Sequence, residues 1–179
     1  MEPIGPLMWE HRTIERAVKL LEKELEKIQK TGKNDHNFLN MMVDFFRIYA
    51  DRTHHGKEED ILFKALNSKP LSSEHKKIMD ELIDEHRKGR KLTSELKEWN
   101  ESHGENSSED IDKVTDALKG LLQLYPQHIE KEDKHFFFPI LDYFSKQERE
   151  DMLKKYYEFD RQLIHEKYKK LIDEWEKIF

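Results

Sequence analysis

The strongest constraint on the fold of this chain is a set of histidine motifs that occurs twice along the sequence. In each copy a glutamate precedes a lone histidine, and a His-x-x-x-Glu pair follows that histidine after 43 residues in the first copy and 42 in the second. The residues of the two copies are Glu10, His11, His54 and Glu58, and Glu85, His86, His128 and Glu132. Metal-ligand side chains that recur at a recurring spacing predict a symmetric site for two metal ions.

Composition limits the classes of protein that this chain can form. Its 179 residues are enough for a substantial core, and we expect a single domain over residues 1–179. A charged fraction of 39% with only 6 Gly and 5 Pro favours long amphipathic helices with solvated outer faces. The chain has no cysteine, which excludes disulfides, iron-sulfur clusters and cysteine-based zinc sites. Any metal must therefore be held by histidine and carboxylate side chains.

Charge and hydropathy argue against nucleic-acid and membrane partners. The net charge is -6 and lysines are interleaved with glutamates, so the sequence offers no basic face to a nucleic-acid backbone. No apolar run approaches the roughly 18 residues of a membrane-spanning helix. The stretch from Met1 to Pro6 lacks the charged-then-apolar layout of a signal peptide, and we expect a cytoplasmic protein.

Apolar residues that recur every three or four positions predict an all-α bundle of four helices plus a fifth. The four helices together span about residues 6–140, and the fifth covers 146–178, opened by a capping box at Ser145 and Glu148. The first four helices are predicted at residues 7–31, 35–67, 72–100 and 108–139, with the main loop at 100–107.

The spacing of each His-x-x-x-Glu pair determines what it offers to a metal. Residues i and i+4 of an α-helix differ by about 40° and one turn, so the imidazole and the carboxylate project in the same direction. Two such helices facing each other, each flanked by a helix with one more histidine, provide four imidazoles and two bridging carboxylates. Neutral imidazole and carboxylate with open positions suit Fe(II), Mn(II) or Zn(II). Two carboxylates offset only half of the charge of two divalent ions, so we expect an added hydroxide or other anion.

Four stretches of the sequence match the motifs of a known family. They are Glu10-His11-Arg12, His54-x-x-x-Glu58 with Leu62-Phe63, Glu85-His86-Arg87-Lys88-Gly89-Arg90, and His128-Ile129-Glu130-Lys131-Glu132-Asp133. Over residues 6–140 the chain resembles the hemerythrin-like proteins, the HHE cation-binding group. The resemblance implies an up-down four-helix bundle around a non-haem di-iron centre (Fe2+/Fe3+) with an oxo or hydroxo bridge. It also implies that the centre binds O2 or a related small molecule, such as NO or peroxide.

The resemblance also assigns roles to individual residues. Terminal ligands are implied at His11, His54, His86 and His128, and bridging carboxylates at Glu58 and Glu132. Oxygen-carrying members have a fifth histidine one turn after the ligand on the third helix, where this chain has Arg90. We therefore expect at least one metal with fewer protein ligands than in an oxygen carrier, which argues for sensing or scavenging over reversible transport.

Two other histidines compete for a role at the site. His55 and Glu59 form a second i, i+4 pair, but the apolar stripe leads to His54, and we predict the His54/Glu58 register with His55 solvated. His135 follows His128 by seven residues and is the best spare ligand, although a buried histidine that binds no metal is the preferred interpretation. A ferritin-like site would need Glu-x-x-His on two helices, and this chain has it once.

Three hypotheses for function follow. The protein binds O2, NO or peroxide at two irons as a sensor, scavenger or store. Alternatively, it is an enzyme of the same fold that consumes peroxide or NO or supports the repair of iron centres; such relatives carry cysteine-bearing segments that this chain lacks. In the third hypothesis it is a helical interaction module with a structural metal such as zinc. The sequence names neither a protein partner nor an oligomeric state.

Overall fold

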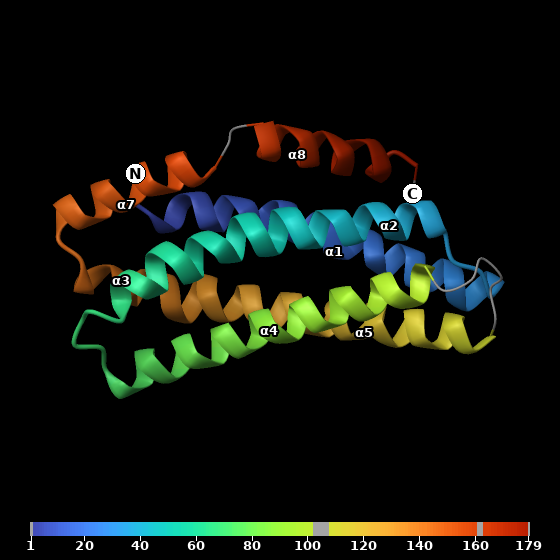
Figure 1. Cartoon of the computed structure of the whole chain (residues 1–179), viewed down its shortest axis with the longest axis horizontal. Coiled ribbons are helices and arrows are strands. Elements are labelled where there is room, and N and C mark those ends of the chain that lie inside the picture. The colour runs from blue at the N-terminus through green and yellow to red at the C-terminus, as the bar shows by residue number, and fades with distance from the viewer. Residues whose placement is uncertain (1, 102–107, 161–162, 179) are drawn as a thin grey trace.

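The structure is a computed structural model that describes residues 2–101, 108–160 and 163–178. In these residues every regular element is helical, as the periodicity predicts, and long helices lie side by side along the molecule (Figure 1). The predicted loop at 100–107 lies largely outside the described residues. The first and third predicted helices correspond to α1 (Ile4–Thr31) and α4 (Ser73–Glu101).

The second and fourth predicted helices are built from several consecutive helical elements. The second is α2 (His36–Phe45), the π-helical η1 (Phe46–His55) and η2 (Glu58–Phe63), and α3 (Lys64–Leu66). The fourth is α5 (Ser108–Lys131), the π-helical η3 (Glu132–Phe136), α6 (Phe137–Ile140) and the 3-10 turn η4 (Leu141–Tyr143). Each His-x-x-x-Glu motif thus includes π-helical residues: His54 and Glu58 lie in η1 and η2, and Glu132 is the first residue of η3. Such turns are rare and often mark functional sites.

Local signals place the ends of these helices. Gly32 has a φ of 66°, which a side chain would disfavour, and its N–H donates to the Ile28 carbonyl to end α1. Asp35 accepts a hydrogen bond from the Phe38 N–H at 3.0 Å and caps α2. Ser145 opens α7 (Lys146–Phe159) with the predicted capping box. Polar and glycine residues therefore fix the boundaries that their types predict.

The core consists of two clusters of buried apolar side chains separated along the bundle. On α1, Leu7 belongs to one cluster and Ile14 to the other, with buried His11 between them. On α4, Leu82 and Leu96 flank His86 in the same way. The histidines thus form a polar layer between two apolar layers, where water is excluded.

The C-terminal region differs from the prediction of one helix at 146–178. It forms two helices, α7 and α8 (Leu163–Glu176), because the backbone leaves the helical conformation at Asp160, where φ is −82° and ψ is 103°. Both run along one side of the bundle, with α8 against α1 and η1 (Figure 1). Tyr168 and Ile172 of α8 are buried, and Tyr168 donates to Asp44. No helix of the described residues has the length and apolar character needed to span a membrane.

Candidate metal centre

The six residues predicted as ligands lie together in the polar layer of the bundle. Each is at most 3% exposed. Together with His55, which was not predicted, they offer ligand atoms in two groups, and within each group the atoms lie within 4.8 Å of one another. Glu58 belongs to both. The first group is His11, His54, Glu58 and Glu132, and the second is His55, Glu58, His86 and His128.

His55 is one of two histidines that the sequence analysis placed wrongly. It is 3% exposed, not solvated, and its ring stacks on that of His86 with centroids 3.8 Å apart. Of the two candidate glutamates, Glu58 is fully buried, whereas Glu59 is 30% exposed and accepts from the His86 Nδ1 at 2.7 Å. The pairs His54/Glu58 and His55/Glu59 are therefore not alternatives. Both histidines point inward, whereas of these two glutamates only Glu58 does so.

The π-helical turns explain this arrangement. A π turn contains one more residue than an α turn. Neighbouring residues such as His54 and His55, which an α-helix would point in different directions, can therefore both face the interior. The same change of register operates in η3, where Phe136 rather than His135 is buried. His135 is exposed, so the expectation that it returns to the core face is wrong.

A ring of carboxylates lies behind the imidazoles and repeats with the sequence motif. The glutamate that precedes each lone histidine accepts a hydrogen bond from the Nδ1 of the partner helix's histidine. The acidic residue after each inward glutamate accepts from the Nδ1 of a lone histidine. The four Nδ1 bonds are His54 to Glu10 at 2.8 Å, His128 to Glu85 at 2.9 Å, His11 to Asp133 at 2.7 Å and His86 to Glu59 at 2.7 Å.

These bonds leave the opposite ring nitrogens and the inward carboxylates free for a metal. A histidine that donates from Nδ1 presents the lone pair of Nε2 to the interior, as metal-ligating histidines do. The Nε2 atoms of all five inward histidines, and both oxygens of Glu58 and Glu132, are buried without a hydrogen-bond partner among the described residues. Four of these nitrogens lie only 3.1 to 3.4 Å from an oxygen of Glu58 or Glu132. So many unsatisfied polar atoms are costly to bury, and a pair of cations would satisfy them.

Electrostatics in the metal-free protein limit the buried charge. Burial acts to lower the pKa of His11, but the hydrogen bond to Asp133 and the nearby carboxylate of Glu132, 3.1 Å from its Nε2, raise that pKa to about 9. Burial and the charge of Glu132 raise the pKa of Glu58 well above its usual range. Burial lowers the pKa of His55 to about 4 despite its contact with a carboxylate. His11 is therefore protonated at neutral pH, Glu58 holds its proton more tightly than an exposed carboxyl group does, and metal binding competes with protons at both residues.

Arg90 occupies the position where the resemblance would place a fifth histidine. Its guanidinium donates to Asp51, at 2.9 Å, and to Glu59. Asp51 lies 3.4 Å from the Nδ1 of His55, and Glu59 accepts from His86. Arg90 thus holds the carboxylates behind two imidazoles, while His55 supplies a fifth inward histidine from the opposite side.

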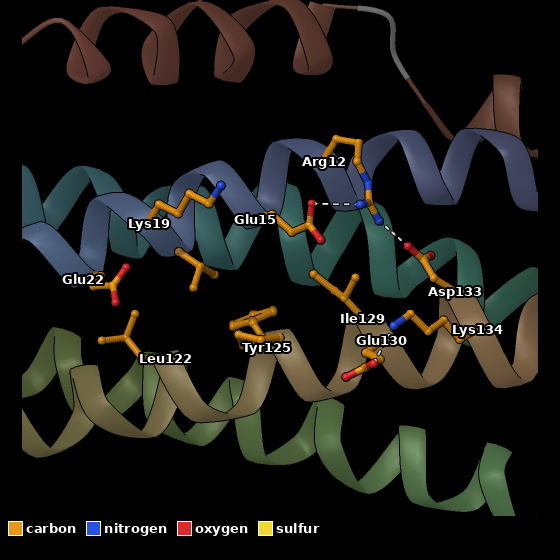
Figure 2. A pocket seen from close by; sticks show the side chains of 12 residues that line it. Arg12, Glu15, Lys19, Glu22, Leu122, Tyr125, Ile129, Glu130, Asp133 and Lys134 are labelled. Carbon is orange, nitrogen blue, oxygen red and sulfur yellow. Dashed lines mark hydrogen bonds and ion pairs between the residues drawn. The ribbon is translucent and has the colours of Figure 1, made fainter.

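A groove of about 590 Å³ lies between α1 and α5, next to the site (Figure 2). Arg12 reaches across it to Asp133, the carboxylate behind His11. The described side chains that line it include Lys19, Tyr125 and Lys134, but no inward histidine or glutamate. The groove therefore borders the carboxylate ring and does not open onto the ligand atoms.

Comparison with known proteins agrees with this geometry. The family model described as the hemerythrin HHE cation-binding domain matches residues 3–141, which include every inward histidine and glutamate. Searches of curated proteins and of solved structures found no match. The family match confirms the resemblance seen in the sequence: the chain belongs to the hemerythrin HHE cation-binding domain family, whose members bind metal ions.

Proposed function

We propose that this protein binds two iron ions in an up-down four-helix bundle and uses them to bind O2 or a related small molecule, NO or peroxide. The observation that carries the proposal is the convergence of five imidazole nitrogens and two carboxylates in two groups that share Glu58. Imidazole and carboxylate donors without thiolate suit iron, with manganese and zinc as the competing metals.

The two groups are unequal, and this indicates where a small molecule would bind. One group has His11 and His54, whereas the other has three histidines, including His55. With Glu58 and Glu132 both bridging, as the resemblance implies, the two-histidine half has four protein ligands and the three-histidine half has five. The two-histidine half then leaves more coordination positions for a ligand from outside. Two ferrous ions bound in the two halves would supply an open coordination position and two electrons to a diatomic molecule.

The fifth histidine changes the balance between reversible binding and onward oxidation. We expected four histidines, with Arg90 leaving one metal short of an imidazole. His55 makes up that number, and the site then has the histidine count that the resemblance implies for oxygen carriers. We therefore favour binding or sensing without consumption of the small molecule.

The surroundings of the site keep water out. The ring of Phe137 stacks on His11, with centroids 5.6 Å apart and planes inclined by 8°. Leu62, Phe63 and Phe136 are also buried below the polar layer. The phenol of Tyr156 is buried, and burial together with the charge of Glu58 raises its pKa well above the usual range, so it stays protonated. Buried apolar and aromatic side chains around the polar layer would protect a bound diatomic from proton-dependent side reactions.

Metal analysis and optical spectroscopy test the proposal. The apoprotein is loaded anaerobically with Fe(II), its metal content is measured, and spectra are recorded before and after exposure to O2, NO or peroxide. Uptake of two irons per chain and a spectral change that reverses on deoxygenation would support it. Failure to take up iron would overturn it, and iron uptake without any reaction would indicate a structural metal. Sustained turnover of peroxide or NO would favour the enzyme hypothesis.

A further inference from the structure

The carboxylate ring is supported by two lysines at equivalent positions, three residues after an inward histidine. Lys57 follows His54 in this way, and Lys131 follows His128. Each lysine donates to the glutamate that holds that histidine, Lys57 to Glu10 and Lys131 to Glu85 at 2.6 Å. The two halves of the site therefore share the same sequence of contacts, from lysine to glutamate to inward histidine.

The second carboxylate of each lysine breaks this symmetry. Lys131 is 25% exposed and also donates to Glu81, a partly exposed residue of α4, at 3.0 Å. Lys57 is fully buried, and its second partner is Asp160, at 2.5 Å. Asp160 lies where α7 ends, outside the residues that match the family. One half of the site thus uses a surface residue where the other uses the C-terminal helices.

The C-terminal helices are tied to Asp160 by a further contact. His165 of α8 bonds to Asp160 through Nε2 at 2.9 Å and to the Tyr49 hydroxyl through Nδ1 at 3.2 Å. Glu10, Asp160 and His165 have the donor types of a cation site. The ammonium of Lys57 bonds to both of these carboxylates and takes the place of that cation.

The buried charge of Lys57 connects these contacts to the metal ligand. A buried ammonium requires partners, and those available are Glu10 and Asp160. Glu10 must also accept from the Nδ1 of His54, so its two oxygens are both committed. Without the charge of Asp160, Lys57 would draw more strongly on Glu10 and weaken its hold on His54. Lys131 can instead turn to water, because it is partly exposed.

We propose that Asp160 is a positioning residue for His54, acting through Lys57 and Glu10, so that α7 and α8 form part of the two-histidine half of the metal site. The inference rests on the proposed metal centre. Because coupling between two binding events is reciprocal, occupancy of this half must also stabilise the docking of α7 and α8. The three-histidine half, with Lys131 and Glu81, lacks this connection among the described residues. Through Asp160 and Lys57, the C-terminal helices would thereby respond to the metal in the two-histidine half.

Metal titration of the full chain separates the two halves. Asp160→Asn keeps the size of the side chain and removes its charge, and Glu81→Gln is the matched control at Lys131. Apoprotein is titrated with Co(II), whose visible bands report each ion. For Asp160→Asn we expect affinity for one ion to fall about tenfold, as for other losses of support behind a ligand, with the second ion unchanged. Glu81→Gln should titrate like the wild type.

Hydrogen exchange of α8 tests the reciprocal effect. Co(II) should increase protection of α8 amides in the wild type and in Glu81→Gln, but not in Asp160→Asn. If Asp160→Asn does not fold, the double variant Lys57→Met/Asp160→Asn removes both buried charges; it should bind both ions tightly without metal-dependent protection of α8. Two tight ions in Asp160→Asn, with wild-type protection of α8, would overturn this inference and leave the proposed function standing. Metal-dependent protection of α8 in the double variant would likewise overturn this inference and leave the proposed function standing. A wild-type chain that binds no metal would overturn both.

Discussion

Replacing His55 with leucine should have opposite effects on the metal-free and the metal-loaded protein. Both ring nitrogens of His55 are buried without a hydrogen-bond partner among the described residues. Because burial lowers its pKa to about 4, the side chain is neutral at neutral pH, and His55→Leu changes size and charge very little. Removing unsatisfied buried polar groups recovers about 1–3 kcal/mol. The metal-free variant should therefore unfold at a temperature higher by roughly 2–4 °C for each kcal/mol gained.

The metal-loaded variant should instead be less stable than the loaded wild type. His55 belongs to the three-histidine half, and its loss removes one ligand of that ion. A ligand that binds the folded state stabilises it by about 4.1 kcal/mol at a concentration one thousand times its Kd, so at that Fe(II) concentration the loss of one ion outweighs the gain of about 1–3 kcal/mol in the metal-free state. Thermal unfolding in chelator measures the expected rise in unfolding temperature, and thermal unfolding in Fe(II) measures the expected fall. Elemental analysis counts the ions that the variant retains.

His135→Leu is the matched control, since its side chain is exposed. It should keep both ions and the wild-type response to Fe(II). The reasoning would be refuted if His55→Leu retained two ions with wild-type affinity, or if its metal-free form were less stable than the wild type.

Four further predictions follow from the polar layer and its surroundings. The metal-free protein should lose about 3 kcal/mol of stability as the pH rises from 6.5 to about 9, because the pKa of His11 is raised above its unfolded value and this contribution is complete only below 6.5. Unfolding curves that show no loss of stability across this range would contradict the prediction. Metal affinity should rise over the same range, as binding displaces protons from His11 and Glu58, and proton release can be measured calorimetrically in two buffers. Tyr156→Phe removes a buried hydroxyl without a partner among the described residues and should raise the free energy of unfolding of the metal-free protein by about 1 kcal/mol in denaturant titrations; a decrease would mean that the hydroxyl has a partner. Arg90→Met should weaken one ion about tenfold, the one in the three-histidine half, and equal weakening of both ions in a Co(II) titration would contradict this role.

The fold class and most of the inward residues could be predicted from local sequence patterns. Apolar residues with helical spacing lead directly to His54 and His128, and the i, i+4 rule then brings Glu58 and Glu132 to the same face. The duplication supplied the remaining two histidines, and the structure buries all six residues. These predictions succeed because each depends on a few neighbouring residues and on the geometry of one helix.

The change of register inside the helices was not predictable in this way. The sequence analysis assumed α-helical geometry throughout, and that assumption placed His55 outside and His135 inside. The structure reverses both, because η1 and η3 are π-helical. A π turn is unfavourable on its own and forms where tertiary contacts compensate for it. Here those contacts include the stacking of His55 on His86, a residue on another helix.

The sequence by itself thus determined the helices, the donor types and the two-fold repetition of the motif. The tertiary structure alone decided which carboxylates stand behind the imidazoles, because those pairs join residues as far apart as His11 and Asp133. It also decided the asymmetry of the two halves. Lys57 and Lys131 are equivalent in the repeat, but only Lys57 is covered by a helix from beyond it and paired with Asp160. Such differences arise from packing between distant segments, which the local periodicity of a chain does not encode.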